Sequence, residues 1–379
     1  MIEIPCERIR AWMFDAALPL WGRSGVDHEC GGYREELDLV GCPTPIGFKR
    51  TRVICRQVYV FSHAAILGWA RGAELAAFGQ EYLFSKAWLG SDRGWARRLS
   101  RAGEVIDATP DLYDLAFVLF ALGWRYRQSR DPEALTRAHQ TLDFIQTHMR
   151  RGEGFAHEMP PHGPRRQNPH MHLLEASIAL FEASVDQRFL DQAREIVTLF
   201  QTRFFDGLTL GEYFTDNWAR APGGQGCIVE PGHQFEWAWI LERYQRFAGV
   251  DVTRSAQALV AFAEQHGVDP ATQLTFNQVR DDGAVLDRGS RTWSNTERIK
   301  GHLALFELTG ADPRMAVASS VRALFDRHLN VNPHGLWIDN FDAAGQPNSK
   351  AVPASTLYHV FLAFAEVLRL QARLKAAFD

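Results

Sequence analysis

The feature that most constrains the fold is a short glycine-bounded motif that recurs about every sixty residues along the 379-residue chain. Each copy mixes alternating apolar and polar residues with glycines, as a β-hairpin does. The first and last copies, GGYREELDLVG and GLWIDNFDAAGQ, are the most alike. The copies begin at Gly31, Gly94, Gly154, Gly207, Leu274 and Gly335. Six such units fill the chain.

Two helical stretches separate successive hairpins, and the first of each pair has an unusual character. It starts with polar residues and then becomes apolar nearly all round, as in AFVLFAL from Ala116 and VFLAFAEVL from Val360. A helix of that kind is buried on both sides. We expect these inner helices at 52–68, 110–126, 169–183, 231–247, 291–308 and 354–373.

The second helical stretch of each pair carries a charged face, as in DPEALTRAHQTLDFIQTHM from Asp131. An amphipathic helix packs one face on a core and leaves the other in water. We expect these outer helices at 5–20, 78–89, 132–149, 187–204, 252–265 and 313–329.

Six inner and six outer helices that alternate along one chain predict an all-α fold, a closed (α/α)6 barrel with short β-hairpins at one rim. The first outer helix then packs beside the last inner one. An open helical solenoid is the alternative, but it needs polar caps at its ends, and the last helix is very apolar. No linker or low-complexity segment interrupts the pattern, so we predict a single catalytic domain over residues 1–379.

Composition excludes several classes of partner. The net charge of -4 shows no basic excess, so we expect neither nucleic acid nor an anionic membrane as a partner. No apolar run is long enough to span a membrane, and the N-terminal residues mix charges with apolar residues, unlike a secretory signal. The five cysteines are scattered without CxxC spacing, which is typical of free thiols in the cytoplasm.

Parallel inner helices bring their N-termini to one mouth of the barrel, so the polar residues there belong to one candidate pocket. The stretch EPGHQFEW from Glu230 places His233, Glu236 and Trp237 on one helical face. The other helix starts contribute Arg52, Arg56, Gln57, Tyr59 and His63; Asp111, Tyr113 and Asp114; Asn168, His170, His172 and Glu175; Trp293 and Glu297; and Ser355, Tyr358 and His359.

Three histidines, His172, His233 and His359, lie at equivalent depths in three repeats, which favours a functional role over independent packing accidents. The remaining histidines of the helices are interpreted as structural, packing or solvent-exposed residues: His63, His170, His139, His148 and His302. Asp111 and Asp114 can serve a site or can simply favour a helix N-terminus, and both readings stay open.

Metal binding is an alternative for the same residues. The runs His170-Met171-His172 and His233-x-x-Glu236 contain ligands that zinc accepts, but no HExxH motif or thiolate pair accompanies them. A carboxylate three residues after a histidine can equally hold the imidazole in one tautomer for acid/base work. We therefore expect no metal and no cofactor.

Four motifs carry a resemblance to a known family: NPHMHLLEA from Asn168, EPGHQFEW from Glu230, the Trp293 and Glu297 pair, and PASTLYHVFLA from Pro353. They resemble the N-acylglucosamine 2-epimerase superfamily over residues 12–365. The resemblance implies the same (α/α)6 barrel and a sugar isomerase or epimerase.

The resemblance also implies roles for individual residues. His233 and His359 become the acid/base pair, and His172 and Glu236 assist at the sugar ring or orient the bases. The substrate-binding residues it implies are Arg52 for hydroxyl groups, Trp293 as a wall of the pocket, and Tyr113, Asn168 and Glu297 for further hydrogen bonds.

Histidine suits this chemistry because its ordinary pKa of about 6.5 lets it take and return a proton near neutrality. We expect a small monosaccharide substrate and, as the leading hypothesis, interconversion of D-mannose and D-fructose through a cis-enediolate after ring opening. The alternative is a 2-epimerase acting on N-acetylglucosamine, N-acetylmannosamine or a disaccharide such as cellobiose. Two other classes of protein stay open: a glycoside hydrolase or lyase with paired carboxylates, and a non-catalytic binding protein. The choice between monomer and homodimer also stays open.

Overall fold

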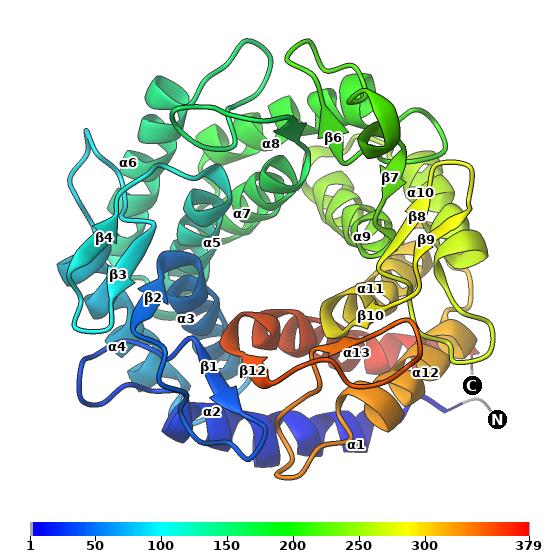
Figure 1. Ribbon diagram of the computed structural model, residues 1–379, viewed down its shortest axis with the longest axis horizontal. Helices are drawn as coiled ribbons and strands as arrows, with labels where there is room; N and C mark the ends of the chain where they lie inside the picture. Colours follow the sequence, from blue (N-terminus) through cyan, green and yellow to red (C-terminus); the bar gives the residue numbers. More distant parts are fainter. Residues whose placement is uncertain (1–2, 379) are drawn as a thin grey trace.

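The computed structural model describes residues 3–378 and confirms the predicted (α/α)6 barrel, with two concentric rings of helices (Figure 1). The inner ring is made of helices that are buried nearly all round, as their apolar centres require. These are α3 (Thr51–Ile66), α5 (Leu112–Ser129), α7 (Asn168–Ser184), α9 (Pro231–Ala248), α11 (Thr292–Thr309) and α13 (Leu357–Phe378).

The outer ring follows the amphipathic stretches. Several outer helices contain or end in a π-helical stretch, such as Trp12–Ala17 between α1 and α2. The outer helix that was predicted at 78–89 begins earlier in the structure, at Gly72. The outer helices are α1 (Cys6–Ala11) with α2 (Leu18–Ser24), α4 (Gly72–Tyr82), α6 (Pro132–His148), α8 (Gln187–Leu199), α10 (Thr253–Gly267) and α12 (Arg314–Ala323).

The rim differs from the prediction of six separate hairpins. Within the described residues, only β3 with β4 and β8 with β9 are neighbouring strands of a single repeat. The other ladders join the strand that leads into one inner helix to a strand of the next repeat. The strands are β1 (Glu36–Asp38), β2 (Phe48–Arg50), β3 (Arg98–Ser100), β4 (Val105–Asp107), β5 (Arg165–Arg166), β6 (Tyr213–Phe214), β7 (Ile228–Val229), β8 (Gln278–Arg280), β9 (Val285–Asp287), β10 (Ser290–Arg291), β11 (Asn340–Phe341) and β12 (Ala351–Pro353).

The same rule closes the ring. β12, which leads into α13, pairs antiparallel with β1 of the first repeat, and Leu37 lies opposite Val352. Below this ladder α1 contacts α13, as predicted. The ring centroids of Trp21 and Trp337 are 5.2 Å apart in a stacked pair, and Trp21 donates a hydrogen bond to the Gly335 carbonyl (3.0 Å). The two ends of the chain therefore meet through backbone and aromatic contacts.

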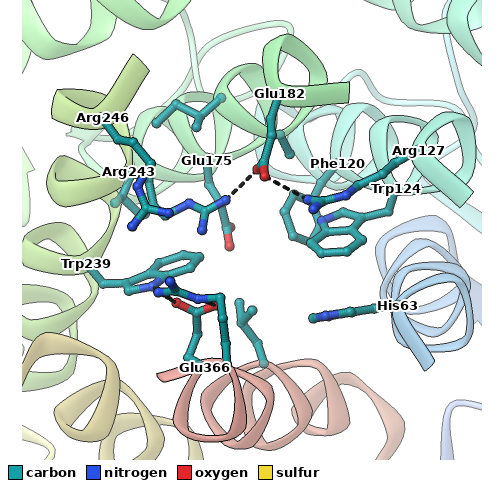
Figure 2. A pocket seen from close by; sticks show the side chains of 15 residues that line it. His63, Phe120, Trp124, Arg127, Glu175, Glu182, Trp239, Arg243, Arg246 and Glu366 are labelled. Atoms are coloured by element: carbon teal, nitrogen blue, oxygen red, sulfur yellow. Dashed lines mark hydrogen bonds and ion pairs between the residues drawn. The ribbon is translucent and has the colours of Figure 1, made fainter. Parts of the chain in front are cut away.

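Away from the rim, a cavity of about 130 Å³ lies among the C-terminal halves of the inner helices (Figure 2). Trp124 and Trp239 form opposite walls, and the Glu175 carboxylate points into the cavity. His63 lines it as well, with its ring stacked on Trp124 at 4.2 Å between centroids. His63 thus belongs to this end of the barrel and not to the predicted pocket.

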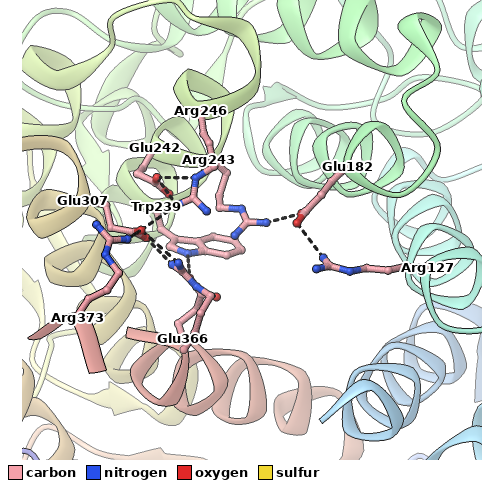
Figure 3. A network of polar contacts seen from close by, with 10 residues as sticks. Arg127, Glu182, Trp239, Glu242, Arg243, Arg246, Glu307, Glu366 and Arg373 are labelled. Atoms are coloured by element: carbon pink, nitrogen blue, oxygen red, sulfur yellow. Dashed lines mark hydrogen bonds and ion pairs between the residues drawn. The ribbon is translucent and has the colours of Figure 1, made fainter. Parts of the chain in front are cut away.

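Ion pairs surround this cavity and join neighbouring inner helices (Figure 3). Glu182 on α7 binds Arg127 on α5 (3.0 Å) and Arg243 on α9 (2.5 Å). Glu307 on α11 binds Arg246 on α9 (3.0 Å) and Arg373 on α13 (2.5 Å). The C-terminal ends of five inner helices are held together in this way.

Candidate active site

A cavity of about 320 Å³ lies at the mouth formed by the N-termini of the inner helices. Seven of the nine predicted site residues line it, and they come from α5, α7, α9, α11 and α13. They are Tyr113, Asn168, His172, His233, Glu236, Trp293 and His359. The prediction that polar helix starts converge on one pocket therefore agrees with the structure.

The two other predicted residues lie just outside this cavity. Arg52 does not line it; its guanidinium forms an ion pair with Asp114 (2.7 Å). Arg56, one turn further along α3, takes its place in the lining and donates hydrogen bonds to the Tyr113 hydroxyl (2.6 Å) and the Ser355 carbonyl (3.0 Å). Arg52 and Arg56 lie on the same face of α3, because they are four residues apart. The ion pair with Asp114 holds Arg52 at the start of the helix, and Arg56 lies one turn further along.

His233 sits in the first turn of α9, which Pro231 starts and which Glu230 precedes as predicted. Its Nδ1 lies 2.9 Å from a carboxylate oxygen of Glu212. Burial disfavours the charged imidazole, but the negative charges of Glu212 and Glu230 outweigh burial and raise the pKa of His233 to about 9. At neutral pH His233 is therefore protonated and can donate a proton.

His359 lies in the first turn of α13, and its Nδ1 lies 2.8 Å from Glu297 Oε1. Burial lowers the pKa of His359 well below its ordinary value, and the positive charges of Arg56 and Lys300 act in the same direction. At neutral pH His359 is therefore uncharged and can accept a proton.

Trp293 lies between these two histidines. Its ring centroid is 5.1 Å from that of His233 and 5.7 Å from that of His359. An indole face in this position provides a flat apolar surface on which a sugar can pack between an acid and a base.

The third histidine is fixed from below. His172 Nδ1 lies 3.0 Å from a carboxylate oxygen of Glu175, and the Tyr358 hydroxyl donates to the other oxygen of Glu175 (2.5 Å). The His172 ring also lies 5.0 Å from the Tyr113 ring. His172 thus presents its other nitrogen to the cavity.

The carboxylate that contacts His233 Nδ1 belongs to Glu212, a residue that the sequence did not reveal. Glu236, which we expected to assist at the sugar ring or orient the bases, lines the cavity, and its buried Oε1 has no hydrogen-bond partner among the described residues. Trp237 is fully buried and donates to Gln167 (2.7 Å), away from the cavity. Glu212 belongs to the rim sequence GEYF, next to β6, which pairs with β5 ahead of α7.

Asn168 flanks the same imidazole. Its side-chain nitrogen lies 3.2 Å from His233 Nε2, and its buried Oδ1 has no partner within residues 3–378. An amide with an unpaired oxygen in the cavity is available to a hydroxyl group of a ligand.

Of the three groups of described side chains that have the spacing of metal ligands, with ligand atoms within 4.8 Å of one another, two lie at this site: His172 with Glu175 and Glu236, and Glu236 with Glu297 and His359. In each of these two groups the Nδ1 of the histidine already contacts a glutamate. The ammonium of Lys300, 2.6 Å from Glu297 Oε2, supplies a positive charge beside the second group.

The histidines interpreted as structural have partners outside this cavity. His170 accepts a hydrogen bond from the Phe155 amide (3.0 Å), and its Nδ1 contacts the Arg166 carbonyl (3.0 Å). His302 pairs with Glu264 (2.6 Å), and His139 with Asp186 (3.1 Å). The ring of His148 packs at a tilt near Phe144, with 4.8 Å between centroids.

The aspartates left open in the sequence act at the start of α5. Asp111 caps this helix by accepting a hydrogen bond from the Asp114 amide (3.0 Å), and Asp114 is buried against Arg52. Neither lines the cavity. Glycoside hydrolysis needs two carboxylates that face each other across the pocket. Neither Asp111 nor Asp114 therefore provides a carboxylate that faces Glu236 or Glu297 there.

Comparison with known proteins agrees with this fold. Residues 31–363 match the family model described as N-acylglucosamine 2-epimerase (GlcNAc 2-epimerase). The chain is 36% identical over 378 residues to a mannose-6-phosphate isomerase from Rhizobium meliloti (strain 1021), covering 97% of each. It is 23% identical over 351 residues to a cellobiose 2-epimerase from Dictyoglomus turgidum, covering 86% of this chain and 87% of the relative. A crystal structure of D-mannose isomerase matches with a TM-score of 0.87 and 21% identity, covering 96% of this chain and 97% of that one.

These likenesses define the class of the protein as an enzyme that isomerises or epimerises sugars. More narrowly, the chain belongs to the N-acylglucosamine 2-epimerase family. Across residues 3–378, no helix has both the length and the apolar character that a membrane crossing requires.

Proposed function

We propose that this enzyme is an aldose-ketose isomerase that interconverts D-mannose and D-fructose, with His359 as the base and His233 as the acid. The observation that carries the proposal is the difference in charge between these two imidazoles, which flank Trp293 in one cavity. A charged and a neutral histidine at the same pH can give and take protons in one reaction.

The proposed reaction starts with ring opening. His233 donates its proton to the ring oxygen as the bond from C1 to that oxygen breaks, and it then takes up the proton of the C1 hydroxyl, so the linear aldehyde forms and His233 is charged again. His359 Nε2 then takes the proton from C2, the C2–H electron pair forms the C1–C2 double bond, and the carbonyl electrons move to O1 to give a cis-enediolate. The charge that develops on O1 is stabilised by the proton of His233. His359 returns its proton to C1, the O2 proton passes to O1 through His233, and the product is the ketose.

The lining of the cavity supports an uncharged sugar. The three arginines Arg56, Arg166 and Arg291 are offset by four carboxylates, so no excess of positive charge is available for an anionic group. The four carboxylates are Glu212, Glu230, Glu236 and Asp339. Two of the relatives are named isomerases acting on mannose or mannose 6-phosphate, which favours isomerisation.

The second candidate is a 2-epimerase, which returns the proton to the opposite face of C2. The cellobiose 2-epimerase among the relatives favours it. In this reaction His172 or His233 delivers the proton from the other side of the enediolate, and the product is an aldose.

The test is incubation of the purified enzyme with mannose, mannose 6-phosphate, glucose, N-acetylmannosamine and cellobiose, followed by chromatography of the sugars. We expect fructose from mannose, and a His359→Asn variant should lower kcat by about 10²–10⁴-fold, the usual contribution of a general base. If fructose 6-phosphate from mannose 6-phosphate is the only ketose formed, the substrate is the phosphorylated sugar and not mannose. A C2-inverted aldose without ketose would establish the epimerase instead.

A further inference from the structure

Lys300 is a charged side chain that the reaction described above does not use. It lies on α11, three residues after Glu297, and both side chains are 0% exposed. Its Nζ is 2.6 Å from Glu297 Oε2 and lies 4.1 Å from the ring centroid of Trp239, the indole that Figure 3 shows beside Glu366. Burying an ion pair costs several kcal/mol per ion and is weak evidence for stability. The position of Lys300 therefore calls for another explanation.

Glu297 connects Lys300 to the candidate base. Its Oε2 contacts the ammonium of Lys300, and its Oε1 lies 2.8 Å from His359 Nδ1. The three groups form a chain in which the ammonium holds the carboxylate and the carboxylate holds the imidazole. Catalytic triads likewise use a carboxylate to orient the imidazole that acts as the base, and here Lys300 contacts that carboxylate from its other side.

The charge of Glu297 depends on this lysine. Burial and the nearby Glu236 raise the pKa of Glu297 well above its ordinary value, and Lys300 is the largest influence in the opposite direction. The pKa of Lys300 itself is raised, because Glu297 and Glu236 outweigh its burial. The charged or titratable groups around Glu297 and His359 are Arg56 on α3, His172 and Glu175 on α7, His233 and Glu236 on α9, Lys300 on α11 and Tyr358 on α13.

We propose that Lys300 is a positioning residue that sets the tautomer of His359. The ammonium 2.6 Å from Oε2 favours the charged form of Glu297, so the carboxylate accepts a hydrogen bond from Nδ1–H and leaves the Nε2 lone pair free to take a proton. Without Lys300, Glu297 carries its own proton and donates it to Nδ1, so the imidazole hydrogen moves to Nε2. His359 then cannot act as a base. The inference about the tautomer rests on the geometry alone, and its consequence for turnover rests on the proposed function.

A Lys300→Met variant tests the catalytic consequence. At neutral pH we expect kcat to fall by about 10²-fold or more, since a wrong histidine tautomer disables a general base. KM should change little, because Lys300 does not line the cavity. Activity should recover as the pH rises through the pKa of Glu297, and this rise should lie at higher pH in the variant than in the unmodified enzyme, because Lys300 lowers that pKa. A loss that is the same at every pH would overturn the proposal.

Two further variants separate this role from a structural one. Glu297→Gln should show the same loss without alkaline recovery, because an amide does not ionise, and Lys300→Met should then add nothing in the double variant. Lys49→Met is the matched control, because Lys49 is also buried but binds Asp27 (3.0 Å) away from the cavity. It should lower stability and leave the shape of the pH profile unchanged. Additive losses in the double variant would contradict an action through Glu297.

The tautomer can be read directly in the substrate-free enzyme by ¹⁵N NMR of the histidine rings, assigned with a His359→Asn variant. We expect the hydrogen of His359 on Nδ1 in the unmodified protein and on Nε2 in Lys300→Met at the same pH. This measurement needs no substrate, so it stands even if the sugar reaction proves different. A His359 ring with the same tautomer in both proteins would refute the inference.

Discussion

At the scale of single residues, the site depends on two histidines that differ in charge because of their neighbours. Carboxylates raise the pKa of His233, whereas burial and nearby cations lower the pKa of His359. Both rings are buried, so burial alone does not separate them. The difference lies in which charged side chains approach each ring: Glu212 and Glu230 at His233, and Arg56 and Lys300 at His359.

Glu212→Gln should change the pH dependence of the reaction. Glu212 is the largest influence that raises the pKa of His233 to about 9, so the variant should move this pKa toward the ordinary value of about 6.5. The alkaline limb of kcat, where His233 loses its proton, should then shift to lower pH. Kinetics between pH 5 and 10 give the measurement.

The contact between His233 and Glu212 also affects the stability of the fold. Because the pKa of His233 is raised in the folded state, the contribution of this contact to stability is fully present below about pH 6.5 and is lost as the pH rises through about 9.

Glu264→Gln is the matched control for Glu212→Gln. It removes a glutamate from His302 outside the cavity and should leave the alkaline limb of kcat in place. An unchanged alkaline limb in Glu212→Gln would show that His233 is not the acid.

At the scale of elements, the sequence predicted the helices and their order well but not the pairing of the strands. A helix shows itself in the sequence through the 3.6-residue period of apolar side chains, as in α6 and α8, or through a long apolar run, as in α5 and α13, whereas a two- or three-residue strand has too few residues to carry a pattern. Glu212 was missed because it lies on the rim 21 residues before His233, where no local pattern indicates the contact. Glu297 was expected at the substrate, but helix geometry alone could not show that His359 lies across from it.

The turns at the rim have the same backbone geometry in most of the repeats. In five of the six copies a backbone amide donates to the carbonyl four residues later, and the residue before that carbonyl has a positive φ. Four of these positive-φ residues are glycines, and the fifth is Trp218 with φ of 66°. The turns start at Asp38, Ser100, Thr215, Arg280 and Asp342.

Trp218→Gly should nevertheless destabilise the protein. Glycine relieves a backbone strain of about 1 kcal/mol, but the indole is 5% exposed, lies 3.6 Å from the Arg165 guanidinium and donates to the Glu153 carbonyl. Removing a buried tryptophan costs about 3–5 kcal/mol, so we expect a net loss of about 2–4 kcal/mol in urea unfolding.

Gly345→Ala probes the same turn position in the last repeat, where the φ of 72° is unfavourable for alanine. We expect a smaller loss, about 1–2 kcal/mol, from the backbone alone. If Trp218→Gly is as stable as the unmodified protein, the contacts of the indole only offset the backbone strain at this position, which would contradict the prediction.

At the scale of the whole molecule, closure of the ring leaves no terminal repeat that can separate from its neighbours. One continuous apolar core runs from Ile9 on α1 to Leu374 on α13. The ladder of β1 with β12 and the stacked Trp21 and Trp337 join the two ends. An open solenoid, by contrast, loses its end repeats first.

We therefore expect the chain to unfold as a single domain, in one cooperative transition. The transitions followed by far-UV circular dichroism and by tryptophan fluorescence should coincide, because the tryptophans and the helices share one core. Two separate transitions would contradict the single domain over residues 1–379.

The central claim is that this closed barrel moves a proton from C2 to C1 of a sugar, and proton NMR of mannose incubated with the enzyme in D₂O tests it most directly. The account predicts fructose, with any deuterium at C1, and fructose formation about 10²–10⁴-fold slower in the His359→Asn variant. Glucose labelled with deuterium at C2, without fructose, would contradict it.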